Sequence, residues 1–110
     1  MIFIDIDMVA NEMSADLEKE IPTIYIGKRN LSYYLNICIK LFDKGSNEII
    51  IEGMGRNIIK AVDVANFINR MYEKSKVIVK DIKIDMVDKG IVRGLPKYVS
   101  RIRILISREA

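Results

Sequence analysis

The sequence predicts a small α/β domain whose elements follow the order β-α-β-α-β-β. Three observations predict this order. Two segments carry apolar residues at helical spacing, shorter segments rich in β-branched residues lie before, between and after them, and glycine or proline separates one segment from the next. The chain has 110 residues, half of them apolar, which is enough sequence for one domain with a hydrophobic core.

The first strand and the first helix are both bounded by clear signals. Thr23–Ile26 is a short β-rich run that ends at Gly27. Asn30 is a good N-cap for the helix that follows, and Gly45 is a good residue to end it. Apolar residues fall on one face of this helix at Leu31, Tyr34, Leu35, Cys38, Leu41 and Phe42.

The second strand and the second helix repeat this arrangement. Glu48–Glu52 is a short apolar strand followed by Gly53 and Gly55. A helix is expected from about Asn57 to Tyr72. Its apolar face is formed by Ile58, Val62, Ala65, Ile68 and Tyr72.

Two strands and a long connection complete the chain. Val77–Val87 predicts a strand with Ile78, Ile82, Ile84 and Met86 on one face. Arg101–Ile106 predicts a last strand with its isoleucines on one face and its arginines on the other. Between them, Asp88–Lys97 contains two glycines and a proline and predicts a loop too long for a tight turn. Long loops in compact domains are usually functional, and this one is basic.

The residues that are absent exclude several kinds of site. The chain has no histidine and one cysteine, so it cannot build a Ser-His-Asp triad, a Cys-His pair or a histidine-liganded metal site. Asp5-x-Asp7 is the nearest approach to a carboxylate metal site, but its flanks alternate as in an ordinary strand. We therefore expect no enzyme activity, no metal, no cofactor and no small-molecule substrate, and we expect Cys38 to be inert core.

The apolar runs and the cysteine content indicate where the protein acts. The longest apolar run, Met1–Ile4, is too short to span a membrane, and no secretory signal pattern is present. A single cysteine is typical of a reducing compartment. We expect a cytoplasmic protein without a membrane partner.

The charge is divided unevenly along the chain. Residues 1–20 hold six acids and one lysine, a net charge of −5, whereas residues 21–110 hold 17 bases and nine acids, a net charge of +8. The sequence thus predicts an acidic N-terminal extension over 1–20 and a basic domain over 21–110. A compact basic domain favours a phosphate-bearing partner, nucleic acid above all. The alternative is a merely soluble surface.

Three segments of the basic domain form a recognisable set. Ile24–Arg29 is a strand followed by glycine and two bases, Gly55–Asp63 reads Gly-Arg-Asn-Ile-Ile-Lys-Ala-Val-Asp, and the last strand begins Val99-Ser100-Arg101-Ile102. Over residues 21–108 the chain resembles the Alba family of archaeal chromatin proteins, whose second segment reads Gly-Arg-Ala-Ile-Ser-Lys-Ala-Val-Asp.

This resemblance implies a fold and a function. The implied fold is a two-layer sandwich, with two helices on one face of a mixed four-stranded sheet and a long hairpin arm. The implied function is non-enzymatic, chromosome-associated coating or compaction of double-stranded DNA with little sequence specificity, with RNA as a second ligand. It also implies a homodimer, or a heterodimer with a paralogue of the same family.

Candidate site residues follow from the charge pattern and the resemblance together. Lys28, Arg29 and Arg56 lie in strand-to-helix turns, where free N–H groups and the helix dipole favour phosphate. Nucleic-acid contacts are expected from Lys28, Arg29, Arg56, Lys60, Lys89, Arg93, Lys97 and Arg101. For Lys60 the alternative is an exposed ion pair with Asp63.

The resemblance implies two further roles. Tyr72 matches the aromatic position through which dimers meet along DNA, and its alternative is a core residue at the end of a helix. Lys28 matches the position of reversible acetylation.

The chain also departs from the family pattern. Asn30 replaces a proline, and Glu52 and Met54 replace bases at the end of the second strand. The alternative function is therefore a divergent paralogue with weakened DNA binding. It would act as a subunit of an RNA complex or as a protein-interaction module.

Overall fold

The structure is a computed structural model that describes residues 20–72 and 77–108. All of the predicted extension except Glu20 lies outside the described residues. The elements in chain order are β1 (Thr23–Tyr25), α2 (Leu31–Asp43), β2 (Glu48–Met54), the short 3₁₀ helix η1 (Gly55–Asn57), α3 (Ile58–Met71), β3 (Val77–Val92) and β4 (Leu95–Arg108).

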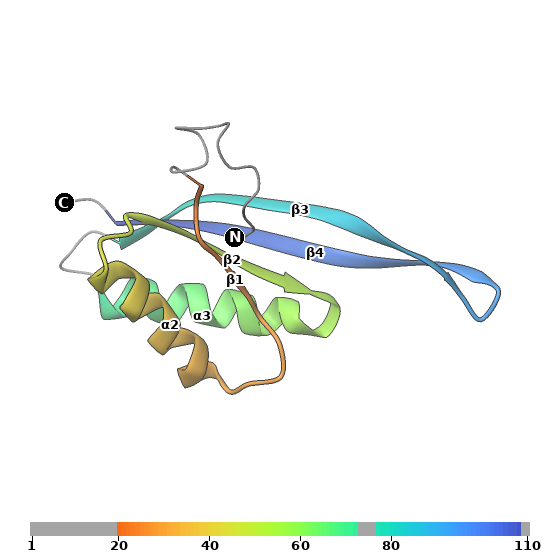
Figure 1. The fold of residues 1–110 in the computed structure, drawn as a ribbon, viewed down its shortest axis with the longest axis horizontal. Coiled ribbons are helices and arrows are strands. Elements are labelled where there is room, and N and C mark those ends of the chain that lie inside the picture. The colour runs from red at the N-terminus through yellow and green to blue at the C-terminus, as the bar shows by residue number, and fades with distance from the viewer. Residues whose placement is uncertain (1–19, 73–76, 109–110) are drawn as a thin grey trace, which may run out of the picture.

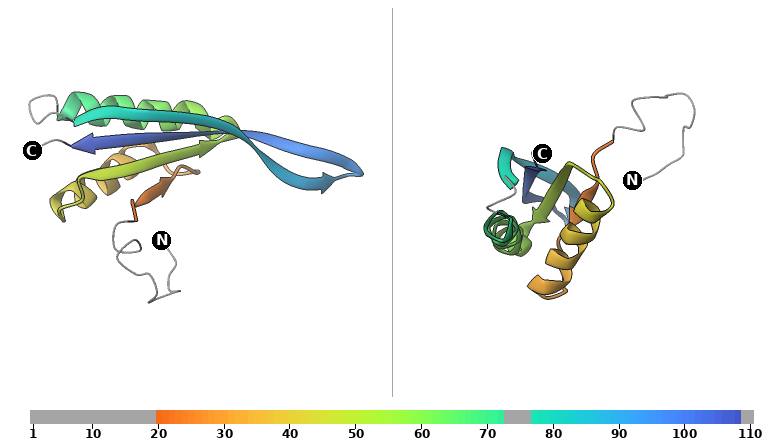
Figure 2. Two further views of the ribbon diagram at one scale, coloured as in Figure 1. Left: turned by 90° about the horizontal axis from the view of Figure 1, so that it is seen from above. Right: turned by 90° about the vertical axis from the view of Figure 1, so that its left-hand side faces the viewer.

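The strands form one mixed sheet in the order β1-β2-β4-β3. β1 runs parallel to β2, whereas β4 is antiparallel to both β2 and β3. Both helices lie on the same face of the sheet, and β3 and β4 run on together as an arm (Figure 1; Figure 2). The predicted two-layer α/β sandwich with a long final hairpin is confirmed.

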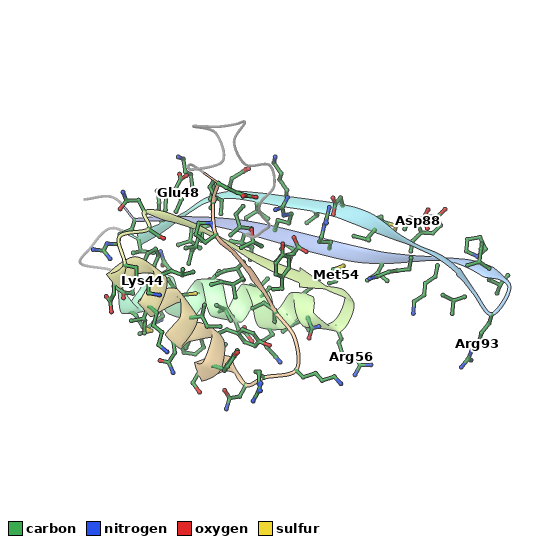
Figure 3. The ribbon with its side chains drawn as sticks, viewed as in Figure 1. Lys44, Glu48, Met54, Arg56, Asp88 and Arg93 are labelled. Atoms are coloured by element: carbon green, nitrogen blue, oxygen red, sulfur yellow. The ribbon has the colours of Figure 1, made fainter. Side chains whose placement is uncertain are left out.

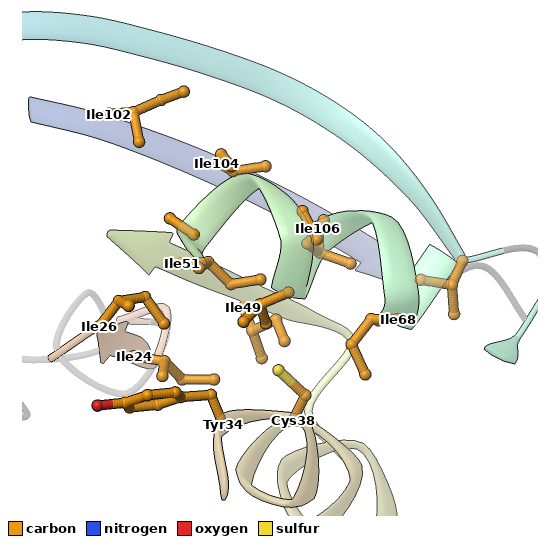
Figure 4. Packing of buried hydrophobic residues seen from close by; sticks show 14 of the residues in the cluster. Ile24, Ile26, Tyr34, Cys38, Ile49, Ile51, Ile68, Ile102, Ile104 and Ile106 are labelled. Atoms are coloured by element: carbon orange, nitrogen blue, oxygen red, sulfur yellow. The ribbon is translucent and has the colours of Figure 1, made fainter. Parts of the chain in front are cut away.

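The core lies between the sheet and the two helices. The buried hydrophobic residues that the strands and the residue after β1 contribute are all isoleucines apart from Val77: Ile24, Ile26, Ile49, Ile51, Ile102, Ile104 and Ile106. They face Tyr34 and Cys38 of α2 and Ile68 of α3 (Figure 4). Cys38 is fully buried, as predicted, and burial raises the pKa of its thiol to about 12. It is therefore a protonated packing residue rather than a nucleophile.

The two predicted caps of α2 are confirmed. The side-chain oxygen of Asn30 accepts a hydrogen bond from the amide of Tyr33 at 3.0 Å. Gly45 has a φ of 101°, and its N–H donates to the carbonyl of Phe42 at 3.0 Å. The Asn30 bond fixes where α2 begins, and therefore the length of the loop that connects it to β1, and the Gly45 bond lies where the helix ends.

α3 lies against β2 at Gly53. A Cβ at this position would lie 2.6 Å from the carbonyl oxygen of Asn57 and 2.8 Å from the Cβ of Ala61. Backbone and alanine atoms cannot rotate away, so only glycine lets the helix approach the sheet this closely.

The predicted loop over Asp88–Lys97 is wrong. β3 and β4 stay paired as far as Val92 and Leu95, and the turn consists of Arg93 and Gly94 alone. Both residues have positive φ, 53° and 79°, as a two-residue type I′ turn requires. Asn-Gly or Asp-Gly would have signalled this turn, and an arginine in the first position does not.

The glycine and proline that indicated a loop lie inside the paired strands. Gly90 has a φ of 79° beside a register shift, where its N–H donates to the carboxylate of Asp88 at 2.8 Å. Pro96 pairs with Ile91. A ribbon of two strands tolerates both residues, because each strand has a free edge.

A second bulge corrects the predicted apolar face of β3. Val79 pairs with Ile106 but Asp81 pairs with Leu105, so Lys80 is an extra residue. The shift turns Ile78 to the open face of the sheet, whereas Ile82, Ile84 and Met86 stay on the helix side. Periodicity alone cannot reveal one inserted residue.

We predict that Gly53→Ala lowers the free energy of unfolding by about 1–3 kcal/mol, because the added methyl group overpacks the contact between β2 and α3. Urea denaturation followed by circular dichroism measures the change. Asn66→Ala, on the exposed side of α3, serves as the control. An unchanged free energy of unfolding in the Gly53 variant would contradict the described packing.

Candidate nucleic-acid interface

Three basic segments lie at one end of the sheet. β1 and β2 are parallel, so their carboxyl ends lie side by side. The loop 27–30 follows β1, and η1 with Arg56 follows β2. The arm, residues 86–100, leaves the sheet at this end too, because the last pair between β2 and β4 is Met54 with Arg101. The topology thus gathers bases that are distant in sequence.

The loop 27–30 exposes two bases on a held backbone. Lys28 and Arg29 are both exposed, and the guanidinium of Arg29 lies 5.2 Å from the ring centre of Tyr33. The N–H groups of Gly27 and Arg29 donate to the hydroxyl oxygen of Tyr34, at 2.7 and 3.2 Å. The two basic side chains of the loop therefore face solvent, whereas its backbone is hydrogen-bonded to the buried Tyr34.

Lys60 is turned toward this loop. Its ammonium donates to the carbonyl oxygens of Gly27 and Arg29, at 2.6 and 2.7 Å. The alternative given for Lys60, an ion pair with Asp63, is wrong: no ion pair within the described ranges joins these two side chains. Lys60 therefore binds the backbone of the loop 27–30 rather than a carboxylate.

Arg56 and the arm extend the basic surface. Arg56 is exposed in η1, just after Gly55 with its φ of 55°. Figure 3 shows Arg56 below the end of β2 and Arg93 at the tip of the arm, both projecting toward the helix side. Lys89 and Lys97 are exposed on the two strands of the arm. Within the described residues, none of these four bases forms an ion pair with a carboxylate.

Arg101, by contrast, already has an anionic partner. Its guanidinium binds the carboxylate of Asp85 in two places, with Nε 2.8 Å from Oδ1. The hydrogen bond from Arg101 lowers the pKa of Asp85 below its ordinary value of 3.8, and the same bond raises the pKa of Arg101. The pair is exposed and lies where β3 and β4 begin to form the arm.

A second ion pair neutralises the neighbouring arginine. Arg103 and Glu52 face each other across β4 and β2, with Nε 3.0 Å from Oε1. The side chain of Glu52 is only 8% exposed. Glu52, which replaces a base of the family pattern, is therefore the internal counterion of Arg103.

An exposed apolar surface lies along the edge of the sheet. Val79, Ile82, Ile84 and Met86 project from β3 to the helix side, and we call them the edge patch; Ile84 is 78% exposed. The Asn69 side chain donates to the carbonyl of Val77 at 2.6 Å, which places this side of α3 against β3. Val62, two turns earlier on α3, lies on the same side of this helix as Asn69 and is half-buried.

Tyr72 lies at the other end of α3, away from the basic segments. It is half-buried, and its ring meets Phe42 edge to face, with 5.4 Å between centroids. This contact is the one expected of a helix-end core residue. A contact between dimers through Tyr72 stays a prediction.

The described residues were also compared with what a membrane span or a metal site requires. None of the helices in the described residues is long and apolar enough to cross a membrane. Across residues 20–72 and 77–108, no three metal-ligating side chains gather at one point.

Two contacts at the candidate interface were not predicted from the sequence, those of Tyr34 and of Asp85. The helical spacing of Tyr34 predicted only a core residue. Because a buried tyrosine hydroxyl needs hydrogen-bond partners, its bonds to the loop 27–30 could have been anticipated. Asp85 gave no signal, because its pairing with Arg101 depends on the strand register.

Comparisons with known proteins place these features in a family context. A sequence model described as Alba matches residues 22–85. The DNA/RNA-binding protein Alba of Nanoarchaeum equitans (strain Kin4-M) is 37% identical over 91 residues, covering 80% of this chain and 99% of that protein.

Solved structures give the same result. Alba from Thermoplasma volcanium superimposes with a TM-score of 0.71 at 31% identity, covering 78% of this chain and 99% of that one. ALBA1 from Trypanosoma brucei gives a TM-score of 0.61 at 22% identity, covering 81% and 70%, and shares the fold.

We predict that carbon-detected NMR titration finds the pKa of the Asp85 carboxyl below 3.8 and that Arg101→Gln raises it. The pair stabilises the fold above the ordinary carboxyl pKa, and this stabilisation is lost as the pH falls through the lowered pKa. The control is Lys97→Gln, which removes a positive charge from β4 on the arm and should leave the titration of Asp85 unchanged. An ordinary pKa in the unsubstituted protein would show that the pair does not persist in solution.

Proposed function

The chain belongs to the Alba family, and we propose that it is a non-enzymatic protein that coats or compacts DNA with little sequence specificity and also binds RNA. One observation carries the proposal. Six exposed bases without a carboxylate partner in the described part of the chain occupy one end of the sheet and the adjoining arm: Lys28, Arg29, Arg56, Lys89, Arg93 and Lys97.

The arrangement of these bases favours phosphate over base edges. Lys28, Arg29 and Arg56 stand on strand-to-helix turns, and the arm bases stand on a narrow ribbon. Bases placed on turns and along a ribbon can follow the phosphate backbone of a nucleic acid. Contacts to phosphate carry no sequence information. We therefore propose association with the chromosome in the cytoplasm, with acetylation of exposed Lys28 as a means of weakening it.

The edge patch supports the proposed homodimer. Three of its residues are more than half exposed, which is unusual for isoleucine and methionine beside the core of a monomeric domain. A two-fold axis through this edge would cover the patch on both copies and double the basic surface. A paralogue with a similar edge would form the heterodimer in the same way.

A second candidate function follows from the two internal ion pairs. Asp85 and Glu52 occupy Arg101 and Arg103, which would otherwise present two further charges near the arm. A duplex that needs these charges would bind less tightly. This observation favours a divergent paralogue that works as an RNA-complex subunit or a protein-interaction module.

We predict a steep loss of duplex binding with salt. If a dimer neutralises about five phosphates, the slope of log K against log salt is about −4.5, so raising salt from 50 to 200 mM weakens binding roughly 500-fold. Fluorescence anisotropy with duplex DNA, single strands and structured RNA measures the slope for each ligand. A flat response for all three ligands would remove nucleic acid as the principal partner.

In the same assay, Lys28→Ala with Arg29→Ala should weaken binding to several unrelated duplexes by a similar factor and flatten the slope. Lys40→Ala with Lys44→Ala removes the same charge from the far end of α2 and serves as the matched control. A change in sequence preference in the first variant would mean that the loop reads bases.

We predict that Ile84→Asp converts the homodimer to a monomer, because burying a carboxylate in the edge patch is costly. Sedimentation equilibrium measures the mass. Ile91→Asp is the matched control, since Ile91 lies on the same strand and is 68% exposed on the arm. A dimeric Ile84 variant would place the interface elsewhere.

A further inference from the structure

Two side chains bind every backbone polar group of Gly27 and Arg29. The hydroxyl oxygen of Tyr34 accepts both N–H groups, and the ammonium of Lys60 donates to both carbonyls. All four distances lie between 2.6 and 3.2 Å. Lys28 lies between the two bound residues and keeps its side chain exposed.

The two side chains also contact each other. The ammonium of Lys60 lies 5.7 Å from the ring centre of Tyr34, and that ring is buried at 4% exposure. Lys60 comes from the first turn of α3 and Tyr34 from the first turn of α2. The loop is therefore tied to both helices at once, although it belongs to neither.

The ammonium of Lys60 is already hydrogen-bonded within the chain. An ammonium has three donors, and two of them are committed to carbonyls of the same chain. Bonds from a charged donor are short and strong, as these are. Lys60 thus differs from Lys28 and Arg29, whose charged groups face outward.

We propose that Lys60 and Tyr34 are positioning residues that hold the loop 27–30 in its binding shape, and that Lys60 is not itself a phosphate contact. This inference rests on the proposed function and deepens it. A loop that is fixed before it meets a ligand has less conformational entropy to lose on binding. The clamp, as we call Tyr34 and Lys60 with the four groups they bind, thereby raises the affinity contributed by Lys28 and Arg29.

Tyr34→Phe is the sharpest test, because it removes one oxygen and no charge. Amide exchange at Gly27 and Arg29 should accelerate in the free protein, and duplex affinity should fall by about 3- to 10-fold. The slope of log K against log salt should stay unchanged, since no phosphate contact is lost. Tyr33→Phe, the same change on the exposed neighbouring tyrosine, should alter neither quantity.

Lys60→Met tests the other half of the clamp, because methionine keeps much of the aliphatic stem but not the charge. A positioning role predicts faster amide exchange in the loop and weaker binding, with the salt slope unchanged. In a protein that already lacks the bases of Lys28 and Arg29, both clamp variants should cost no further affinity. Thermal denaturation confirms that each variant is folded before it is compared.

The outcomes separate the possibilities. Unchanged loop exchange and wild-type affinity in both variants would overturn the proposal. A Lys60→Met slope that flattens by about 0.9 per subunit, with loop exchange unchanged, would make Lys60 a phosphate contact and would also overturn it. If the unsubstituted protein binds no nucleic acid, the proposed function fails, whereas loop exchange in the free protein still decides whether the clamp exists.

Discussion

The close approach of α3 to β2 at Gly53 determines where the candidate interface forms. A side chain at this position would strike the backbone of Asn57 and the methyl group of Ala61, so the helix would have to move away from the sheet. With glycine, the first turn of α3 stays against β2 and beside the end of β1. From there Lys60 reaches across to the carbonyls of the loop 27–30. One missing Cβ thus links the packing of the core to the shape of a surface loop.

The bases near the candidate interface fall into two classes, those paired with a carboxylate and those left exposed. Arg101 and Arg103 lie on the strands of the sheet, and each is paired with a carboxylate on a neighbouring strand. Lys28, Arg29 and Arg56 lie on turns, where no strand neighbour carries an acid to meet them. Arg101 and Arg103 are therefore neutralised within the sheet, whereas the three turn bases stay exposed for a partner, as do Lys89 and Lys97 on the arm. A net charge of +3 conceals this division.

Local signals made most of the fold predictable from the sequence. The helices and their caps at Asn30 and Gly45 depend on residues a few positions apart, and so does the isoleucine alternation of β4. The turn at Arg93 was missed because its first residue is an uncommon choice for positive φ, and the bulge at Lys80 because one inserted residue leaves no trace in composition.

The site was predictable only in part. The spacing of glycine and two bases before a helix identified Lys28 and Arg29 as exposed charges. The clamp joins residues up to 33 positions apart, and the pair of Arg101 with Asp85 depends on a strand register that the sequence does not reveal. These contacts are tertiary, so they required the three-dimensional structure.

The most direct test of the central claim is a titration of isotope-labelled protein with a short duplex, followed by amide NMR. We expect the largest shift changes at residues 28, 29 and 56 and along residues 86–100, at the end of the sheet where the basic turns and the arm meet. Shift changes confined to the open face of the sheet, at Thr23, Ile50 and Leu105, would contradict it.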